Sequence, residues 1–238
     1  MQGVYSFWDK GLQPSEFDLG IEVLIIVLTT AEAFTTRNFY RDTIVKSLNS
    51  RDLKYKLIFL FGMRDSNEKI HDDIEFENEI HHDLVLPMVQ DSYQTAALKL
   101  LSSFYWISEI PKQNKLKWVV KIDDDVLLNV EKFDTYVKTI LFTEKTNSIY
   151  GQVYYGTPPM RSGKWYGFRF ILKKCFYSHF SFSREVSYME YPNDTYPDYC
   201  IGPIYMMSPK TSEKLLLKFE DSSSFLWVED VYLTGRRY

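Results

Sequence analysis

The stretch Ile21-Glu22-Val23-Leu24-Ile25-Ile26-Val27-Leu28-Thr29-Thr30 is a short, almost uninterrupted run of apolar residues that follows a glycine. A transmembrane helix needs about 20 apolar residues, whereas this run is half as long and contains Glu22. A secretory signal has a basic region before its apolar segment, but the only basic residue upstream of this run is Lys10. The abundance of β-branched side chains therefore predicts a buried β-strand.

Downstream of this strand, strand-like apolar runs alternate with segments of helical spacing. The further predicted strands are residues 55–61, 84–86 and 118–122, and the helices between them begin near residues 35, 66 and 91. Thr35 and Thr36 are the expected N-cap of the first helix. Such alternation implies right-handed crossovers and a mostly parallel sheet with helices on both faces, so we expect an α/β, Rossmann-like fold. The dinucleotide fingerprint Gly-x-Gly-x-x-Gly does not follow the first strand.

The composition is that of an ordinary globular protein. With 238 residues, 45% of them hydrophobic and 25% charged, the chain has the length of one large domain or two small ones. A net charge of −4 argues against binding to a nucleic-acid backbone. Two cysteines exclude a disulfide scaffold and a four-cysteine zinc site. Aromatic residues make up 17% of the chain; they suit stacking on sugars or on nucleic-acid bases, although an aromatic-rich core is the simpler explanation.

Three consecutive aspartates, Asp123, Asp124 and Asp125, directly follow the predicted strand 118–122. In open α/β sheets, ligands bind beyond the carboxyl ends of the strands. Asp123 and Asp125 project to the same side of an extended backbone, and two carboxylates about 4 Å apart repel by roughly 4 kcal/mol at an effective dielectric of 20. A hard cation such as Mg²⁺ or Mn²⁺ would relieve that repulsion and could bridge to a diphosphate. A solvated acidic turn is the alternative interpretation.

Seven blocks of sequence, in the same order, resemble the β-1,3-galactosyltransferase and β-1,3-N-acetylglucosaminyltransferase family, which includes the fringe-like enzymes. The blocks are Arg37–Thr43, Leu60–Gly62, Asp91–Lys99, Lys121–Val126, Lys164–Tyr166, Tyr196–Gly202 and Glu229–Tyr232. Two positions depart from the family pattern: Ile44 stands where Trp is usual, and Thr95 stands where Asn is usual. The resemblance covers about residues 21–235.

The resemblance implies a GT-A fold and a type II enzyme of the Golgi membrane with a lumenal catalytic domain. Such an enzyme would transfer galactose or N-acetylglucosamine from a UDP-sugar, with inversion, to the 3-hydroxyl of an acceptor glycan on a glycoprotein or glycolipid. We expect residues 1–20 to be an N-terminal extension and residues 21–238 a single domain. Within it, residues 21–130 would bind the nucleotide and residues 131–238 would form the acceptor side.

Site roles follow from the same resemblance. Asp123 and Asp125 would hold Mn²⁺ or Mg²⁺, with Asp125 as the more direct ligand, and Asp123 or Asp124 would face the ribose. The residues expected around the nucleotide are Arg37, Arg41, Asp91 and Lys99. Helix capping and surface ion pairs explain those four equally well.

Asp230 matches the catalytic base of the family. It lies between Trp227-Val228 and Val231, so we expect partial desolvation, which raises the pKa of a carboxyl group and makes it a stronger base. An ordinary N-cap aspartate of a helix is the alternative.

Three departures keep a second function open. Relatives have an N-terminal membrane anchor, and they continue past the position of Tyr238 to supply a late histidine to the metal, so the chain is expected to be truncated at both ends. Residues 167–185 interrupt the family pattern with five Phe and no acid before Glu185, as either a retained intron or an acceptor-side loop. The alternative is therefore a non-catalytic relative that binds UDP or partner proteins. Asn193-Asp194-Thr195 is a glycosylation sequon.

Overall fold

The computed structural model describes residues 6–63, 68–141, 147–162, 185–220 and 225–235. The block Lys164–Tyr166 and the predicted insert, apart from Glu185, lie outside these ranges.

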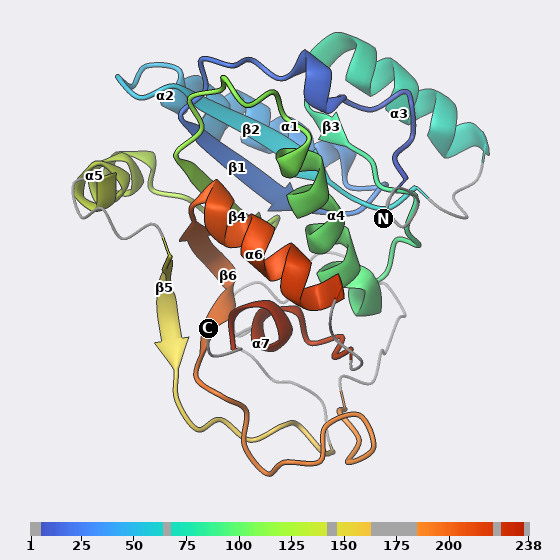
Figure 1. Ribbon diagram of the computed structural model, residues 1–238. Helices are drawn as coiled ribbons and strands as arrows, with labels where there is room; N and C mark the ends of the chain where they lie inside the picture. Colours follow the sequence, from blue (N-terminus) through green and yellow to red (C-terminus); the bar gives the residue numbers. More distant parts are fainter. Residues whose placement is uncertain (1–5, 64–67, 142–146, 163–184, 221–224, 236–238) are drawn as a thin grey trace, which may run out of the picture.

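A six-stranded sheet with the order β3-β2-β1-β4-β6-β5 forms the centre of the described chain (Figure 1). Four neighbouring strands run parallel, and β6 and β5 complete the sheet in antiparallel pairings. The strands are β1 (Val23–Leu28), β2 (Tyr55–Leu60), β3 (Leu84–Val85), β4 (Trp118–Asp123), β5 (Ile149–Tyr154) and β6 (Tyr199–Met207). The predicted α/β fold with a mostly parallel sheet is confirmed.

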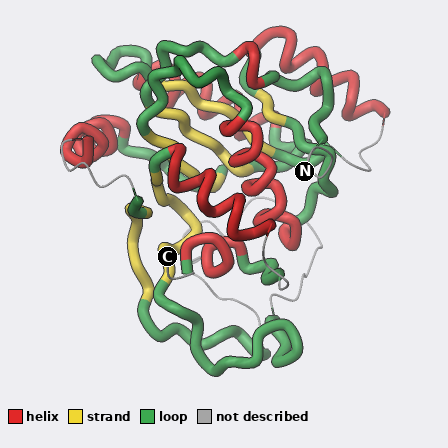
Figure 2. Tube along the Cα trace, in the orientation of Figure 1, coloured by secondary structure: helices red, strands yellow, loops and turns green. Residues whose placement is uncertain are grey.

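Helices cover both faces of this sheet, and β1 is accordingly buried on both sides. Leu24 and Ile26 face one apolar cluster, while Val23, Ile25 and Val27 face the other. The first face carries α4 (Ala96–Ser108), α6 (Pro209–Glu220) and α7 (Glu229–Thr234). The second carries α1 (Phe34–Tyr40), α2 (Lys46–Leu48), α3 (Glu68–His81) and α5 (Val130–Leu141). Figure 2 shows these helices on either side of the strands.

The first helix differs from its prediction at the N-terminus. It begins at Phe34 with Ala33 as its N-cap, so Thr35 and Thr36 lie inside the first turn and the predicted cap was wrong. The physical reason is the buried side chain of Arg37, which donates to the carbonyl oxygens of Thr30 and Ala31 and so holds the preceding turn close to the helix. A π-helical turn, Arg41–Val45, links α1 to α2.

The N-terminal segment packs onto the domain. Leu12 and Phe17 are buried in the cluster beneath α4, and the indole N–H of Trp106 donates to the carbonyl of Leu12 at 3.0 Å. None of the described helices is long and apolar enough to cross a membrane.

The two halves of the chain share one sheet. Strand β6, from the second half, pairs directly with β4, so Lys121 lies opposite Tyr205 and Ile122 opposite Ile204. This pairing carries residues that are distant in sequence to the carboxyl end of β4, where the three aspartates begin.

Candidate active site

The aspartate turn is fixed at the carboxyl end of β4 by groups from β1 and α1. Asp123 is the last residue of β4 and pairs in register with Leu28 of β1. The hydroxyl of Thr29, the next residue after β1, donates to Oδ2 of Asp124 at 2.7 Å. The hydroxyl of Tyr40 donates to the carbonyl oxygens of Asp123 and Val126 at 3.1 and 2.5 Å. The turn is thus held through its backbone and through Asp124, while the carboxylate of Asp125 remains exposed.

Lys121 joins the aspartate turn to the second half of the domain. Its side chain is only 2% exposed, and its ammonium lies 2.7 Å from Asp123 Oδ1 and 3.2 Å from Glu229 Oε2. It also donates to the carbonyl of Gly202 on β6 at 2.5 Å. Glu229 accepts a further hydrogen bond from the hydroxyl of Tyr205. One buried cation therefore connects β4, β6 and α7.

Asp230 lies beside this cluster, in the first turn of α7. Its Oδ2 accepts from the backbone N–H of Gly202 at 3.0 Å, and its Oδ1 accepts from the N–H of Val231 at 2.8 Å. Gly202 is thus bound through its carbonyl by Lys121 and through its N–H by Asp230. The structure therefore brings Asp230 to the same edge of the sheet as Asp123.

Burial dominates the electrostatics of these acids. It raises the pKa of Asp123 to about 6, although Lys121 acts in the opposite direction. It also raises the pKa of Asp124, Glu229 and Asp230 above the usual range. For Lys121, burial favours the neutral amine, but Glu229 and Asp123 outweigh burial and raise the pKa of the ammonium. The burial of Asp230 and its raised pKa agree with the partial desolvation predicted for this residue.

Asp91 and Lys99 form a second, largely buried ion pair near the end of β1. Lys99 is 4% exposed, and its ammonium lies 2.7 Å from Oδ1 of Asp91. Oδ2 of Asp91 accepts from the N–H of Ala31 at 2.9 Å. The short helix Tyr93–Thr95 separates Asp91 from α4, and Ser92 and Thr95 form a capping box around it. Asp91 thus fixes the loop after β1 and is itself held by α4.

Arg37 and Arg41 are bound by acids of the α3 region. Arg37 is fully buried and donates to both carboxylate oxygens of Glu77 at 2.8 and 2.7 Å. Arg41 pairs with Glu77 at 2.7 Å and with both oxygens of Asp83 at 2.8 and 2.7 Å. These partners give both arginines a structural role behind the loop after β1.

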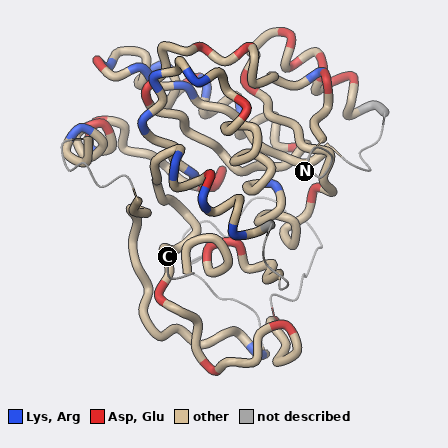
Figure 3. Tube along the Cα trace, in the orientation of Figure 1, with Lys and Arg blue, Asp and Glu red and all other residues tan. Residues whose placement is uncertain are grey.

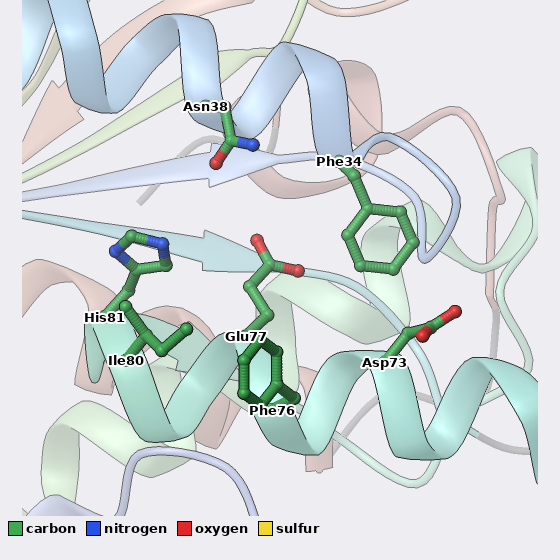
Figure 4. A pocket seen from close by; sticks show the side chains of 7 residues that line it. All are labelled: Phe34, Asn38, Asp73, Phe76, Glu77, Ile80 and His81. Atoms are coloured by element: carbon green, nitrogen blue, oxygen red, sulfur yellow. The ribbon is translucent and has the colours of Figure 1, made fainter.

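A surface cavity of about 350 Å³ lies next to these arginines, between α1 and α3 (Figure 4). Its lining includes Phe34, Phe76, Glu77 and Ile80. Helix α3 is rich in acids, as Figure 3 shows, but the carboxylate of Glu77 is already paired with Arg37 and Arg41. None of the candidate residues at the end of β4 lines this cavity, so it is separate from the candidate site at the aspartate turn.

Sequence reasoning missed several residues that assemble the site: Thr29, Tyr40, Lys121, Tyr205 and Glu229. For Lys121 a signal existed, since alternate residues of a strand project to the same face and Lys121 precedes Asp123 by two positions. Glu229 is adjacent to Asp230, but nothing in the sequence pairs it with Lys121.

Comparison with known proteins identifies the family of this chain. The model of the galactosyltransferase family matches residues 35–237, which include Arg37, the aspartate turn and α7. The chain belongs to the galactosyltransferase family. The fold is accordingly an α/β, GT-A-like glycosyltransferase fold.

Two relatives illustrate the similarity of this galactosyltransferase-family chain to characterised proteins. Beta-1,3-galactosyltransferase 1 of Mus musculus is 28% identical over 226 residues, which are 93% of this chain and 61% of the relative. Lactosylceramide 1,3-N-acetyl-beta-D-glucosaminyltransferase of Xenopus tropicalis is 26% identical over 221 residues, which are 89% of this chain and 52% of the relative. The chain thus spans between half and two thirds of the length of these relatives.

Proposed function

We propose that this chain is an inverting hexosyltransferase that moves galactose or N-acetylglucosamine from a UDP-sugar to the 3-hydroxyl of an acceptor glycan. The observation that carries the proposal is the arrangement around Gly202. Lys121, which pairs with Asp123, donates to the carbonyl oxygen of Gly202, and Asp230 accepts from the N–H of Gly202. A donor-side acid and a candidate base are therefore held by the same backbone unit. The names of the two relatives support a 1,3-linkage and either of the two sugars.

A divalent cation, Mn²⁺ or Mg²⁺, fits the aspartate turn. Asp125 is exposed and makes no hydrogen bond or ion pair with any residue that the structure describes. The described residues contain no cluster of three or more potential ligands, and Mg²⁺ is usually bound by one or two carboxylates together with substrate phosphates. Asp123 and Asp125 would hold the ion, which when bound supplies positive charge to the diphosphate of the donor.

Asp230 is the proposed general base. In the transfer, the acceptor hydroxyl gives its proton to Asp230, its oxygen forms the new bond to the anomeric carbon, and the bond to the UDP oxygen breaks. Inversion requires attack from the side opposite the departing UDP. The two N–H groups that bind Asp230, those of Gly202 and Val231, hold the carboxylate in one orientation, and orientation of this kind lowers the entropic cost of the reaction.

The remaining residues position this machinery. Lys121 balances part of the negative charge of Asp123 and Glu229. Asp124 is the proposed contact to the nucleotide ribose, with Thr29 orienting it. Asp91 and Lys99 shape the nucleotide side through the loop after β1. In this proposal Arg37 and Arg41 support that loop and do not touch the nucleotide, because their guanidinium groups are already paired with Glu77 and Asp83.

By resemblance, the proposed location is the lumenal side of the Golgi membrane, where the acceptor would be a glycoprotein or glycolipid.

Titration calorimetry with UDP tests the proposal. Wild-type protein should bind UDP more tightly with Mn²⁺ than with EDTA, and Asp125→Ala should remove most of that difference. Transfer from UDP-galactose and UDP-N-acetylglucosamine to oligosaccharides is then measured separately. Equal affinity for UDP with and without the ion would contradict the metal site, and metal-dependent binding without transfer would identify a non-catalytic relative.

A further inference from the structure

Two aromatic rings meet between the loop that follows Asp91 and the segment that leads into α7. The rings of Tyr93 and Trp227 lie 5.8 Å apart at an interplanar angle of 64°. Tyr93 is 50% exposed, and Trp227 is partly exposed. Trp227 precedes the candidate base Asp230 by three positions, and Tyr93 follows the candidate donor-side residue Asp91 by two. The ring pair therefore connects a segment of the donor side to a segment of the acceptor side.

A carboxylate is fixed beside this pair. The indole N–H of Trp227 donates to Oε1 of Glu190 at 3.2 Å. Oε2 of Glu190 accepts from the N–H and the hydroxyl of Ser187 at 2.8 and 2.7 Å. Each carboxylate oxygen has more than one lone pair, so Glu190 can still accept a hydrogen bond from a ligand.

The loop that carries Glu190 is held in place although it is exposed. Arg161 donates to the carbonyl oxygens of Val186 and Asn193 at 2.9 and 2.7 Å, and its guanidinium lies 3.9 Å from the ring centre of Tyr188. The N–H of Val186 donates to the carbonyl of Met160 at 2.8 Å. A loop fixed at several points loses little entropy when a ligand binds.

A cavity of about 140 Å³ adjoins this carboxylate. Its lining includes Glu190, Tyr191, Phe225 and Tyr232 but neither Tyr93 nor Trp227, so the cavity and the ring pair share Glu190. Apolar and aromatic walls with a few placed polar groups are typical of small-molecule sites. The charge of Glu190, together with that of Asp230, which directly precedes the lining residue Val231, disfavours a phosphate or another anion. A neutral ligand with an apolar face and several hydroxyl groups matches both features.

We propose that Tyr93, Trp227 and Glu190 form the subsite that binds a hexose ring of the acceptor glycan. The C–H face of the ring lies on the aromatic pair, and one of its hydroxyl groups donates to Glu190. This inference rests on the proposed function, because it supplies the acceptor that Asp230 deprotonates. It assigns Trp227 and Glu190 to acceptor recognition and leaves nucleotide binding to the aspartate turn.

Saturation-transfer NMR on the full chain tests the subsite without donor or metal. The probes are methyl β-galactoside, methyl N-acetyl-β-glucosaminide and N-acetyllactosamine. At least one should receive saturation from the wild-type protein, and Trp227→Ala and Tyr93→Ala should each weaken its binding by about tenfold, as expected for loss of a central aromatic contact. Glu190→Gln should weaken binding less, since an amide oxygen still accepts a hydrogen bond.

Tyr136→Ala is the matched control, because Tyr136 is 49% exposed on α5, which packs on the opposite face of the sheet. It should bind the sugar like wild type. UDP affinity in the presence of Mn²⁺ should be unchanged in Trp227→Ala, which separates this inference from the proposed function. If Trp227→Ala is insoluble, the sugar affinities of Trp227→Phe and Tyr93→Ala are measured in its place. Wild-type affinity in the soluble ring variants, no saturation of any probe, or loss of UDP binding instead of sugar binding would each overturn the subsite.

Discussion

The ammonium nitrogen of Lys121 lies 3.2 Å from Oε2 of Glu229, which joins strand β4 to helix α7 across 108 positions of sequence. Both side chains are buried, and Asp123 shares the same cation. The contact therefore serves both stability and the geometry of the site, because it holds the segment with Asp230 against the segment with the aspartates.

Lys121→Met removes this cation and leaves two carboxylates without their partner. Removal of one member of a buried ion pair costs roughly 3–5 kcal/mol, so the midpoint of urea unfolding should fall strongly. Lys117→Met is the control: Lys117 pairs with Glu22 at 2.7 Å but is 51% exposed, and exposed pairs contribute about 0–1 kcal/mol. Equal midpoints for the two variants would contradict the role given to Lys121.

The pair of Arg37 and Glu77 predicts a dependence of stability on pH. Burial opposes ionisation of Glu77, but Arg37 and Arg41 outweigh it and hold the pKa of Glu77 below its usual value of 4.5. A carboxyl group whose pKa is lower in the folded state stabilises the fold above its unfolded pKa, and this contribution disappears as the pH falls through the folded pKa. Urea unfolding midpoints between about pH 7 and pH 3 should therefore decline in wild type.

Glu77→Gln should be less stable than wild type at neutral pH, because Arg37 is then buried without a counter-charge, and its midpoint should decline less on acidification. Glu79→Gln changes an exposed acid of the same helix and should retain the wild-type decline. Parallel curves for Glu77→Gln and wild type would show that this carboxylate does not carry the acid sensitivity.

Gly62 is predicted to tolerate no side chain. A Cβ at this position would lie 2.1 Å from the carbonyl oxygen of Val89, which belongs to the backbone of the segment before Asp91. Gly62→Ala must therefore displace that segment, at a cost of about 1–3 kcal/mol for overpacking, and should weaken UDP binding through Asp91. In Gly20→Ala the nearest contact is the side chain of Asp18 at 3.2 Å, and thermal unfolding of this control should change little.

Much of the fold could be predicted from the sequence because its signals are local. The apolar run at residues 21–30 reflects burial of β1 on both faces, and the three aspartates directly follow a strand, so their place at the sheet edge was expected. The pairing of Lys121 with Glu229 depends on the antiparallel pairing of β6 with β4, which local periodicity does not encode. The prediction of a helix cap at Thr35 and Thr36 was wrong for a similar reason, since buried Arg37 fixes the chain before the helix.

The partners of Arg37 and Arg41 could not be predicted from local sequence either. The spacing of the two arginines resembles that of the family motif, but Glu77 and Asp83, which bind them, follow 40 and 42 positions later. Side-chain partners at that distance depend on the packing of α3 against α1, and they decide whether a guanidinium is free to meet a ligand.

The proposed lumenal location predicts glycosylation at Asn193. Asn193-Asp194-Thr195 is the only Asn-x-Ser/Thr sequence in the chain, and all three residues are exposed. Chain secreted from eukaryotic cells should lose mass when treated with peptide N-glycosidase, and Asn193→Gln and Thr195→Ala should abolish the shift, whereas Thr195→Ser should retain it. Secreted chain whose mass does not change on treatment would argue against modification at this site.

Asp230→Asn tests the proposed base, because it keeps the shape of the side chain and removes its basicity. General-base catalysis contributes about 10²-fold to 10⁴-fold, so turnover should fall within that range in a transfer assay with a saturating UDP-sugar. UDP affinity should remain close to wild type, since Asp230 contacts Gly202 and Val231 and is not a proposed ligand of the nucleotide or the ion. Asp198→Asn, at an exposed position before β6, should leave turnover unchanged. A lower turnover accompanied by equally weakened UDP binding would indicate that the substitution displaced α7 and with it Glu229 and Lys121. Unchanged turnover would exclude Asp230 as the base, and the acceptor proton would then have to pass to another of the acids at this edge of the sheet.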